Sequence, residues 1–206
     1  MGFPDFFEHA PVVRVRDPLA KLLGSTTDGI MDYRFEDAVR LAGHSCPTVA
    51  GAFLTARAAL KALYPDTLPE RGGVLVHMPS PEMEGTTGVV AQVLTLITGA
   101  AAQGGFKGIG GRFARNGLLS FATHGGEHDD AVRVERVDTG AAVKVTFDFN
   151  RIPADESQHE RMQAVIHNRE THEQQVEFAR LWQERVRRIL LEHADDPSLI
   201  GVVHID

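Results

Sequence analysis

The sequence contains one cysteine among its 206 residues and has no long apolar run. A single cysteine excludes an intramolecular disulfide, which is typical of proteins from reducing compartments. The longest apolar stretch, residues 89–102, is shorter than the ~20 residues that a membrane-spanning helix needs. No basic segment followed by an apolar run occurs near residue 1, so no secretory signal peptide is expected. These absences predict a cytoplasmic protein that has no contact with a membrane.

Positive charge is also scarce. The chain has 21 lysine and arginine residues against 28 aspartate and glutamate residues, which gives a formal net charge of -7 at pH 7. Nucleic-acid binding requires a clustered basic face. The one basic group, at residues 185–188, lies among acidic neighbours and is typical of a solvated helix face. We therefore expect no nucleic-acid partner.

Hydrophobic periodicity divides the chain into three parts. Residues 1–33 contain three spaced prolines and are predicted to form an irregular N-terminal arm. Residues 34–150 are predicted to form the core, with helices at 34–43 and 47–63, a strand at 72–79, a helix at 87–102, a strand at 118–123 and a hairpin around residues 138–140. This order predicts an α+β fold with an α-β-α-β-β-β core and a mixed or antiparallel sheet.

Residues 151–206 are predicted to form a C-terminal helical extension. The sequences SQHE (157–160) and THEQ (171–174) each fit a capping box, which marks the start of a helix. The second helix has an apolar stripe made by Val176, Ala179, Trp182, Val186 and Ile189. This stripe must cover either the α+β core or a second copy of the chain, and we take a homodimer contact as the working expectation.

The triplet His44-Ser45-Cys46 is the most reactive combination in the chain. Residues two apart on a regular helix point about 200° from each other, but Pro47 marks the helix start, so His44 and Cys46 lie before it and their side chains can converge. A helix N-terminus also favours a thiolate, the form of cysteine that binds metals or attacks substrates. The alternative is a buried cysteine packed as a small hydrophobe, beside a histidine bonded to the backbone.

Three residues near the predicted strand 72–79 are candidates to complete a metal site. His77 ends that strand, and Glu82 and Glu84 lie in the loop before the apolar helix. Together with His44 and Cys46 they offer the mixed nitrogen, sulfur and oxygen donors that suit zinc or iron. The alternative for the carboxylates is a solvated loop, and Thr86 and Thr87 are expected to be helix caps. The sequence THGGEH, with His124, Glu127 and His128, is either a further metal site or a polar turn.

A glycine-rich loop at residues 104–111 is a second candidate site. Its glycines allow the backbone to approach an anion, to which Lys107 and Arg112 add charge. The loop lies between a helix and a strand and does not match a known phosphate-binding motif.

Two stretches resemble signatures of the FmdE family, which is named after a small component of formylmethanofuran dehydrogenase. In GHSCPTVAGAFLTARAAL the matching residues are His44, Cys46, Pro47 and Gly51, and in LTLITGAAAQGGFKGIGGRFARNGLLSF they are Thr98, Gly99, Lys107 and Gly108. The resemblance covers about residues 34 to 150. It implies an α-β-α-β-β-β core, a divalent metal, usually zinc, near the His-x-Cys motif, and a dimeric or accessory role beside a molybdenum or tungsten enzyme.

The chain departs from that family in three ways. Thr48 stands where the family usually has glycine, no second cysteine precedes the apolar helix, and no four-cysteine zinc ribbon follows the core. Any core metal must therefore take its other ligands from His77, Glu82, Glu84 or a partner chain. Methanofuran chemistry is not carried over.

The predicted function is that of a metal-binding accessory protein linked to metalloenzyme or redox metabolism. The predicted ligands of the ion, taken as zinc, are His44, Cys46, His77 and Glu84, with Lys107 and Gly108 as cofactor-binding residues. One alternative is a metal- or thiolate-dependent enzyme acting on a small anionic substrate. Others are heme or iron bound through His44 or Cys46, and a metal-free interaction module. The predicted partners are a second copy of the chain and a small molecule or a metalloenzyme.

Overall fold

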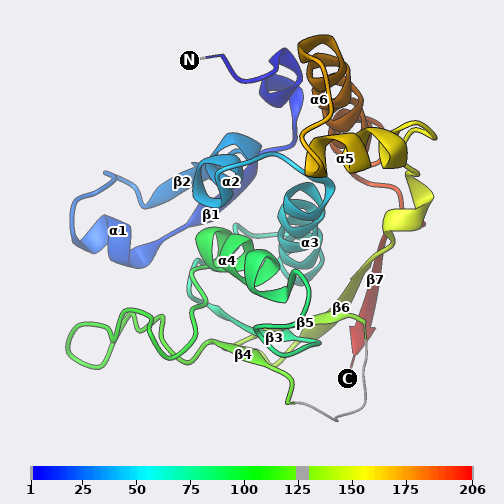
Figure 1. The fold of residues 1–206 in the computed structure, drawn as a ribbon. Helices are drawn as coiled ribbons and strands as arrows, with labels where there is room; N and C mark the ends of the chain where they lie inside the picture. Colours follow the sequence, from blue (N-terminus) through cyan, green and yellow to red (C-terminus); the bar gives the residue numbers. More distant parts are fainter. Residues whose placement is uncertain (1, 124–129, 206) are drawn as a thin grey trace.

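A five-stranded sheet forms one layer of the computed structural model, which describes residues 2–123 and 130–205, and the helices lie on one side of it (Figure 1). The strand order is β4-β3-β5-β6-β7, with β3 parallel to β4 and all other neighbours antiparallel. The strands are β3 (Val74–Met78), β4 (Leu119–Phe121), β5 (Val132–Arg136), β6 (Ala142–Phe147) and β7 (Ile200–Ile205). The mixed sheet and its helices confirm the predicted α+β class.

Two helices, α3 (Pro47–Leu63) and α4 (Thr87–Thr98), pack against each other and cover one face of the sheet (Figure 1). They bury the alternate strand residues that point inward, such as Val76, Val134 and Val143, each 0% exposed. The preceding helix α2 (Phe35–Ala42) ends at Gly43, whose φ of 76° is a conformation that glycine adopts without strain. The predicted order of the core elements is therefore confirmed.

The N-terminal arm is not irregular, which corrects the prediction for residues 1–33. It contains a 3-10 turn η1 (Asp5–His9), a two-stranded sheet of β1 (Val13–Arg16) and β2 (Ile30–Tyr33), and the short helix α1 (Pro18–Leu22) between the strands. Four-residue strands are too short to give a clear alternation pattern. Pro18 also argues against a helix in the sequence. In the structure it occupies the first helical position of α1, where proline is tolerated.

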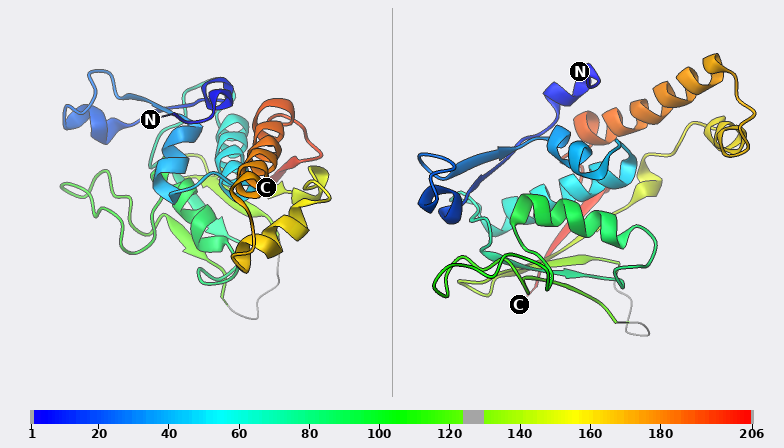
Figure 2. Two further views of the ribbon diagram at one scale, coloured as in Figure 1. Left: turned by 45° about the horizontal axis from the view of Figure 1, so that its top comes forward. Right: turned by 60° about the vertical axis from the view of Figure 1, so that its left-hand side comes forward.

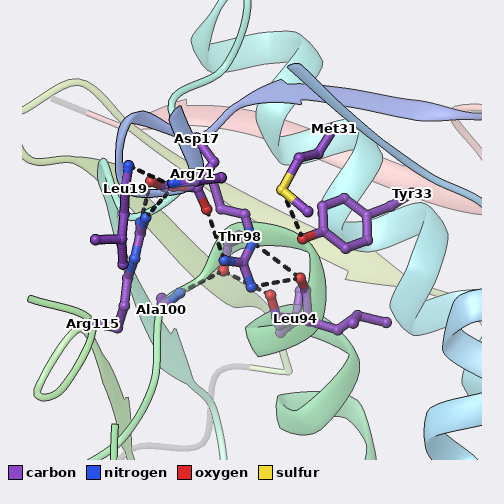
Figure 3. Close-up of polar contacts among 11 residues, drawn as sticks. Asp17, Leu19, Met31, Tyr33, Arg71, Leu94, Thr98, Ala100 and Arg115 are labelled. Atoms are coloured by element: carbon purple, nitrogen blue, oxygen red, sulfur yellow. Dashed lines mark hydrogen bonds and ion pairs between the residues drawn. The ribbon is translucent and has the colours of Figure 1, made fainter. Parts of the chain in front are cut away.

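A buried ionic cluster ties this arm to the core (Figure 3). The carboxylate of Asp17 accepts hydrogen bonds from Arg71 Nη1 at 3.0 Å and Arg115 Nη2 at 2.8 Å. It also accepts from the backbone N–H groups of Leu19 and Ala20, and so caps α1. Because Arg71 in turn donates to the carbonyl of Leu96, one carboxylate links α1, the end of α4 and the segment after the glycine loop.

The C-terminal extension contains α5 (Gln158–Ile166), α6 (His172–Arg187) and the π-helical turn η3 (Arg188–Glu192), after a short 3-10 turn η2 (Phe149–Arg151). The helices α5 and α6 contact each other and extend away from the sheet (Figure 2). Val186 and Ile189, at 0% and 1% exposed, pack into the core of this chain, whereas Val176 is 56% exposed. The C-terminal half of the stripe therefore covers its own core, and the homodimer remains a prediction.

The extension is not wholly helical, because it ends in the strand β7. This strand pairs antiparallel with β6 and forms one edge of the sheet. Among residues 2–123 and 130–205, no helix has the length and apolar character that crossing a membrane requires.

Candidate functional site

His44 lies on the exposed turn between α2 and α3, and the backbone fixes its ring. The Nδ1 atom is 3.0 Å from the carbonyl oxygen of Ala42. A carbonyl can only accept a hydrogen bond, so Nδ1 carries the proton and the neutral ring keeps its lone pair on Nε2. Metal-binding histidines are commonly oriented in this way, with the second ring nitrogen donating to a carbonyl or carboxylate.

Cys46 caps the N-terminus of α3, as its place before Pro47 predicts. Its Sγ accepts a hydrogen bond from the backbone N–H of Val49 at 3.4 Å, and the residue is 7% exposed. The sulfur therefore sits at the positive end of a 17-residue helix with a small opening to solvent. It is a soft donor two positions from the free Nε2 of His44.

Helix α6 holds the residue between these two donors. Trp182 Nε1 and Gln183 Nε2 donate to the carbonyl of Ser45 at 3.0 Å and 3.3 Å, and the Ser45 hydroxyl donates to Gln183 Oε1 at 2.9 Å. The His44–Cys46 turn is thus fixed by a helix more than 130 residues further along the chain. Sequence reasoning missed this link, for which the one tryptophan in the apolar stripe was the only signal.

The other predicted ligands lie elsewhere. The residues of β3 alternate between buried and half-buried, and His77 is one of the half-buried ones. It therefore points away from the face that Val76 and Met78 bury. Its Nδ1 is 2.6 Å from the Ser120 hydroxyl of β4, and burial, followed by the charge of Arg133, lowers its pKa. Glu84 lies in an exposed turn before α4.

No closed metal shell forms within the described part of the chain. Among residues 2–123 and 130–205, no three histidine, cysteine, aspartate or glutamate side chains come together in a way that could hold an ion. Zinc binding by His44 and Cys46 therefore remains a prediction, and among the described residues His77 and Glu84 do not join them in a cluster. The candidate residues His124, Glu127 and His128 lie outside the described residues.

The glycine loop forms a tight turn. Gly108 has φ of 89°, and a Cβ there would lie 2.3 Å from the carbonyl oxygen of Arg112, so the turn requires glycine. A cavity of about 850 Å³ beside the loop is lined by Gly104, Gly105, α4 and β4, and Glu82 lies at its wall. Lys107 and Gly108 do not line it, and their binding of a cofactor remains a prediction.

A second cavity, of about 140 Å³, lies between α3, α4 and the sheet, and sequence reasoning missed it. Thr86 and Thr87, expected to be caps, line this cavity, and Thr86 makes no side-chain capping bond. Gly51, one of the residues that carry the FmdE resemblance, allows the Phe147 ring to lie against α3, because a Cβ at this position would be 2.8 Å from the ring. The available signal was the row of small and hydroxyl residues at helical spacing on α3, namely Thr48, Gly51, Ala52 and Thr55.

Comparison with known proteins finds a distant similarity of fold. No family model matches the sequence, and no curated protein matches it. One similar solved structure is an FmdE-like protein from Syntrophus aciditrophicus, described as related to a tungsten formylmethanofuran dehydrogenase. It is 17% identical, the match covers 84% of this chain and 73% of that chain, and the TM-score is 0.44.

Proposed function

We propose that this protein binds a transition metal ion, zinc in the first instance, through His44 and Cys46, and that it serves as an accessory protein to a metalloenzyme or redox system. The observation that supports this most directly is the hydrogen bond between His44 Nδ1 and the carbonyl of Ala42. It leaves Nε2 of an exposed imidazole as a free donor in the orientation that metal-binding histidines use.

The second donor suits the same ion. A thiolate and an imidazole are the ligands that zinc prefers. The three hydrogen bonds between Ser45 and α6 hold the backbone between the two donors, so little conformational entropy is lost when both bind one ion.

Two ligands leave the coordination sphere open. The remaining positions would be filled by water, by a small molecule or by donors of a partner chain, including His77 or Glu84 of a second copy. Such a site exchanges its ion more readily than a closed four-ligand site, and this suits an accessory protein better than a purely structural zinc.

Elemental analysis of purified, zinc-reconstituted protein tests the proposal. About one zinc per chain is expected for the wild type, with loss in both Cys46→Ser and His44→Ala, since each removes a ligand. His167→Ala is the matched control, because His167 is also exposed and its Nδ1 also bonds a backbone carbonyl, that of Gln163. Stoichiometric zinc that survives both ligand substitutions would overturn the assignment, as would folded wild-type protein that takes up none.

A further inference from the structure

The 140 Å³ cavity lies where the N-terminal ends of two helices meet the sheet. Thr48 belongs to the first turn of α3, and Thr86 and Thr87 begin α4. The first N–H groups of a helix have no partners within it and carry partial positive charge. The remaining wall is largely apolar and includes Val90, Val132, Val145 and Phe147. The cavity is thus apolar with a row of hydrogen-bond donors along one side.

One hydroxyl in the cavity wall has no protein partner among the described residues. Thr55 lines the cavity and is 4% exposed, yet its side chain makes no hydrogen bond to any of the described residues. Thr98 of α4, 1% exposed, shows the usual arrangement, because its hydroxyl donates to the carbonyl of Leu94 at 2.7 Å. The Thr55 oxygen is not fully enclosed by protein, so it is open to the cavity. A ligand atom in the cavity can therefore form a hydrogen bond with it.

The described lining of the cavity offers an anion hydrogen-bond donors and helix ends instead of a basic side chain. Among the described residues, no lysine, arginine or histidine lines the cavity, so its positive potential comes from the two helix ends. Asp130 is the one charged residue in the described part of the lining, and it is exposed to water, which screens its charge. Asp130 therefore weakens anion binding without preventing it.

The volume limits the size of the ligand. A cavity of about 150 Å³ in another protein holds benzene, so 140 Å³ corresponds to about six non-hydrogen atoms. We propose that this cavity binds a small monocarboxylate of about four to six non-hydrogen atoms. The carboxylate accepts hydrogen bonds from the threonine hydroxyls, that of Thr55 among them, and the short hydrocarbon chain packs against Val90, Val132 and Phe147. Neither His44 nor Cys46 lines the cavity, so the site is separate from the metal site proposed above.

Calorimetric titration with acetate, propionate and butyrate, and with neutral butyramide, tests the proposal. The wild type should bind at least one of the carboxylates and bind butyrate more tightly than butyramide. Thr55→Val keeps the shape of the side chain and should weaken carboxylate binding roughly tenfold or more, since a hydrogen bond to a charged group is lost. Thr146→Val is the control, because Thr146 is exposed and does not line the cavity. Wild-type protein that binds none of the three acids, or Thr55→Val that binds them as well as the wild type, would overturn the proposal.

Two further measurements separate a ligand-binding hydroxyl from a structural one. Without ligand, Thr55→Val should melt at the same temperature as the wild type or higher, because it breaks no hydrogen bond to the described residues and keeps the shape of the side chain. A lower melting temperature would show that the hydroxyl has a structural partner. Asp130→Asn should tighten carboxylate binding, whereas weaker binding would show a cationic or hydrogen-bond-donating ligand and contradict the proposal. None of these substitutions alters His44 or Cys46, so failure here is distinguishable from failure of the metal proposal.

Discussion

At the scale of single residues, His44 and His77 differ in what their rings contact. His44 is exposed and bonded to a backbone carbonyl, which leaves one nitrogen free for a ligand. His77 is half-buried against β4, where burial first and the charge of Arg133 next lower its pKa below the ordinary 6.5. His77 is therefore held neutral by the fold, and its contribution to stability depends on pH.

The unfolded chain takes up a proton at His77 near pH 6.5, whereas the folded protein resists protonation until a lower pH. The stability that His77 contributes is therefore present above pH 6.5 and is lost as the pH falls through the folded pKa. Urea unfolding at about pH 7.5 and about pH 5.5 should show a larger loss of unfolding free energy for the wild type than for His77→Gln. Equal losses for the two proteins would contradict the assigned environment.

Burial dominates the pKa shift of His77, but it does not dominate that of the buried carboxylate of Asp17. Burial acts to raise its pKa, but the backbone N–H of Ala20 and the guanidinium groups of Arg71 and Arg115 outweigh burial, so the pKa lies below the ordinary 3.8. Asp17→Asn leaves two arginines without their counter-charge and should lower the free energy of unfolding at neutral pH by about 3 kcal/mol. The difference from the wild type should shrink as the pH falls below 3.8, because the carboxylate then loses its charge.

Asp32→Asn provides the control for this substitution. Asp32 pairs with Arg14 at 2.7 Å on the surface, where such pairs contribute about 1 kcal/mol or less. Chemical denaturation of the three proteins at neutral pH gives the comparison. If Asp17→Asn and Asp32→Asn cost the same, the buried cluster does not hold the arm to the core.

Some residues of the candidate sites could be predicted from the sequence, and others could not. Cys46 at a helix start follows from Pro47 alone, because proline at the first helical position is a local signal. The cavity that Thr55 lines could not be predicted, because its other walls include strands β5 and β6, which lie about 80 residues or more away in the chain. The contact between Ser45 and Trp182 is equally non-local.

At the scale of elements, helix α6 is the part that positions the proposed metal turn. Trp182→Phe keeps an aromatic ring beside Phe178 but removes the hydrogen bond to the carbonyl of Ser45. We expect zinc affinity to fall roughly 3- to 10-fold, as the loss of one ordinary hydrogen bond of about 1 kcal/mol implies. Competition with a chromogenic chelator measures this affinity.

Val176→Ala on the same helix is the control, since Val176 is 56% exposed and lies six residues before Trp182. It should leave zinc affinity unchanged. If Trp182→Phe binds zinc as tightly as the wild type, α6 does not position the ligands.

Elements with a clear local pattern could be predicted from the sequence, and strands that depend on a distant partner could not. Helix α3 and the hairpin of β5 and β6 have clear periodicities of 3.6 and 2 residues. Of the two predicted capping boxes, the one before α6 is confirmed by both Thr171–Gln174 hydrogen bonds. The one before α5 is wrong, because Ser157 makes no side-chain capping bond. Strands β1, β2 and β7 were missed, because no tight turn joins any of them to its partner strand and pairing with that strand stabilises each one.

At the scale of the whole molecule, one hydrophobic core joins all three parts of the chain. Phe7 of the N-terminal arm, Val134 of the sheet and Val186 of α6 belong to the same buried cluster. Asp195, which follows η3, bonds to Arg57 and Lys61 of α3, and these two cations lower its pKa to about 2. The C-terminal extension is therefore integral to the fold that presents His44 and Cys46.

The most direct test of the central claim is titration of the metal-free protein with cobalt(II), which replaces zinc and reports its ligands by colour. Binding through Cys46 predicts a thiolate-to-cobalt charge-transfer band in the near ultraviolet that saturates at about one ion per chain and is displaced by zinc. The band should be absent in Cys46→Ser and weakened in His44→Ala. A spectrum without a charge-transfer band in folded wild-type protein, or a band that persists in Cys46→Ser, would contradict the account.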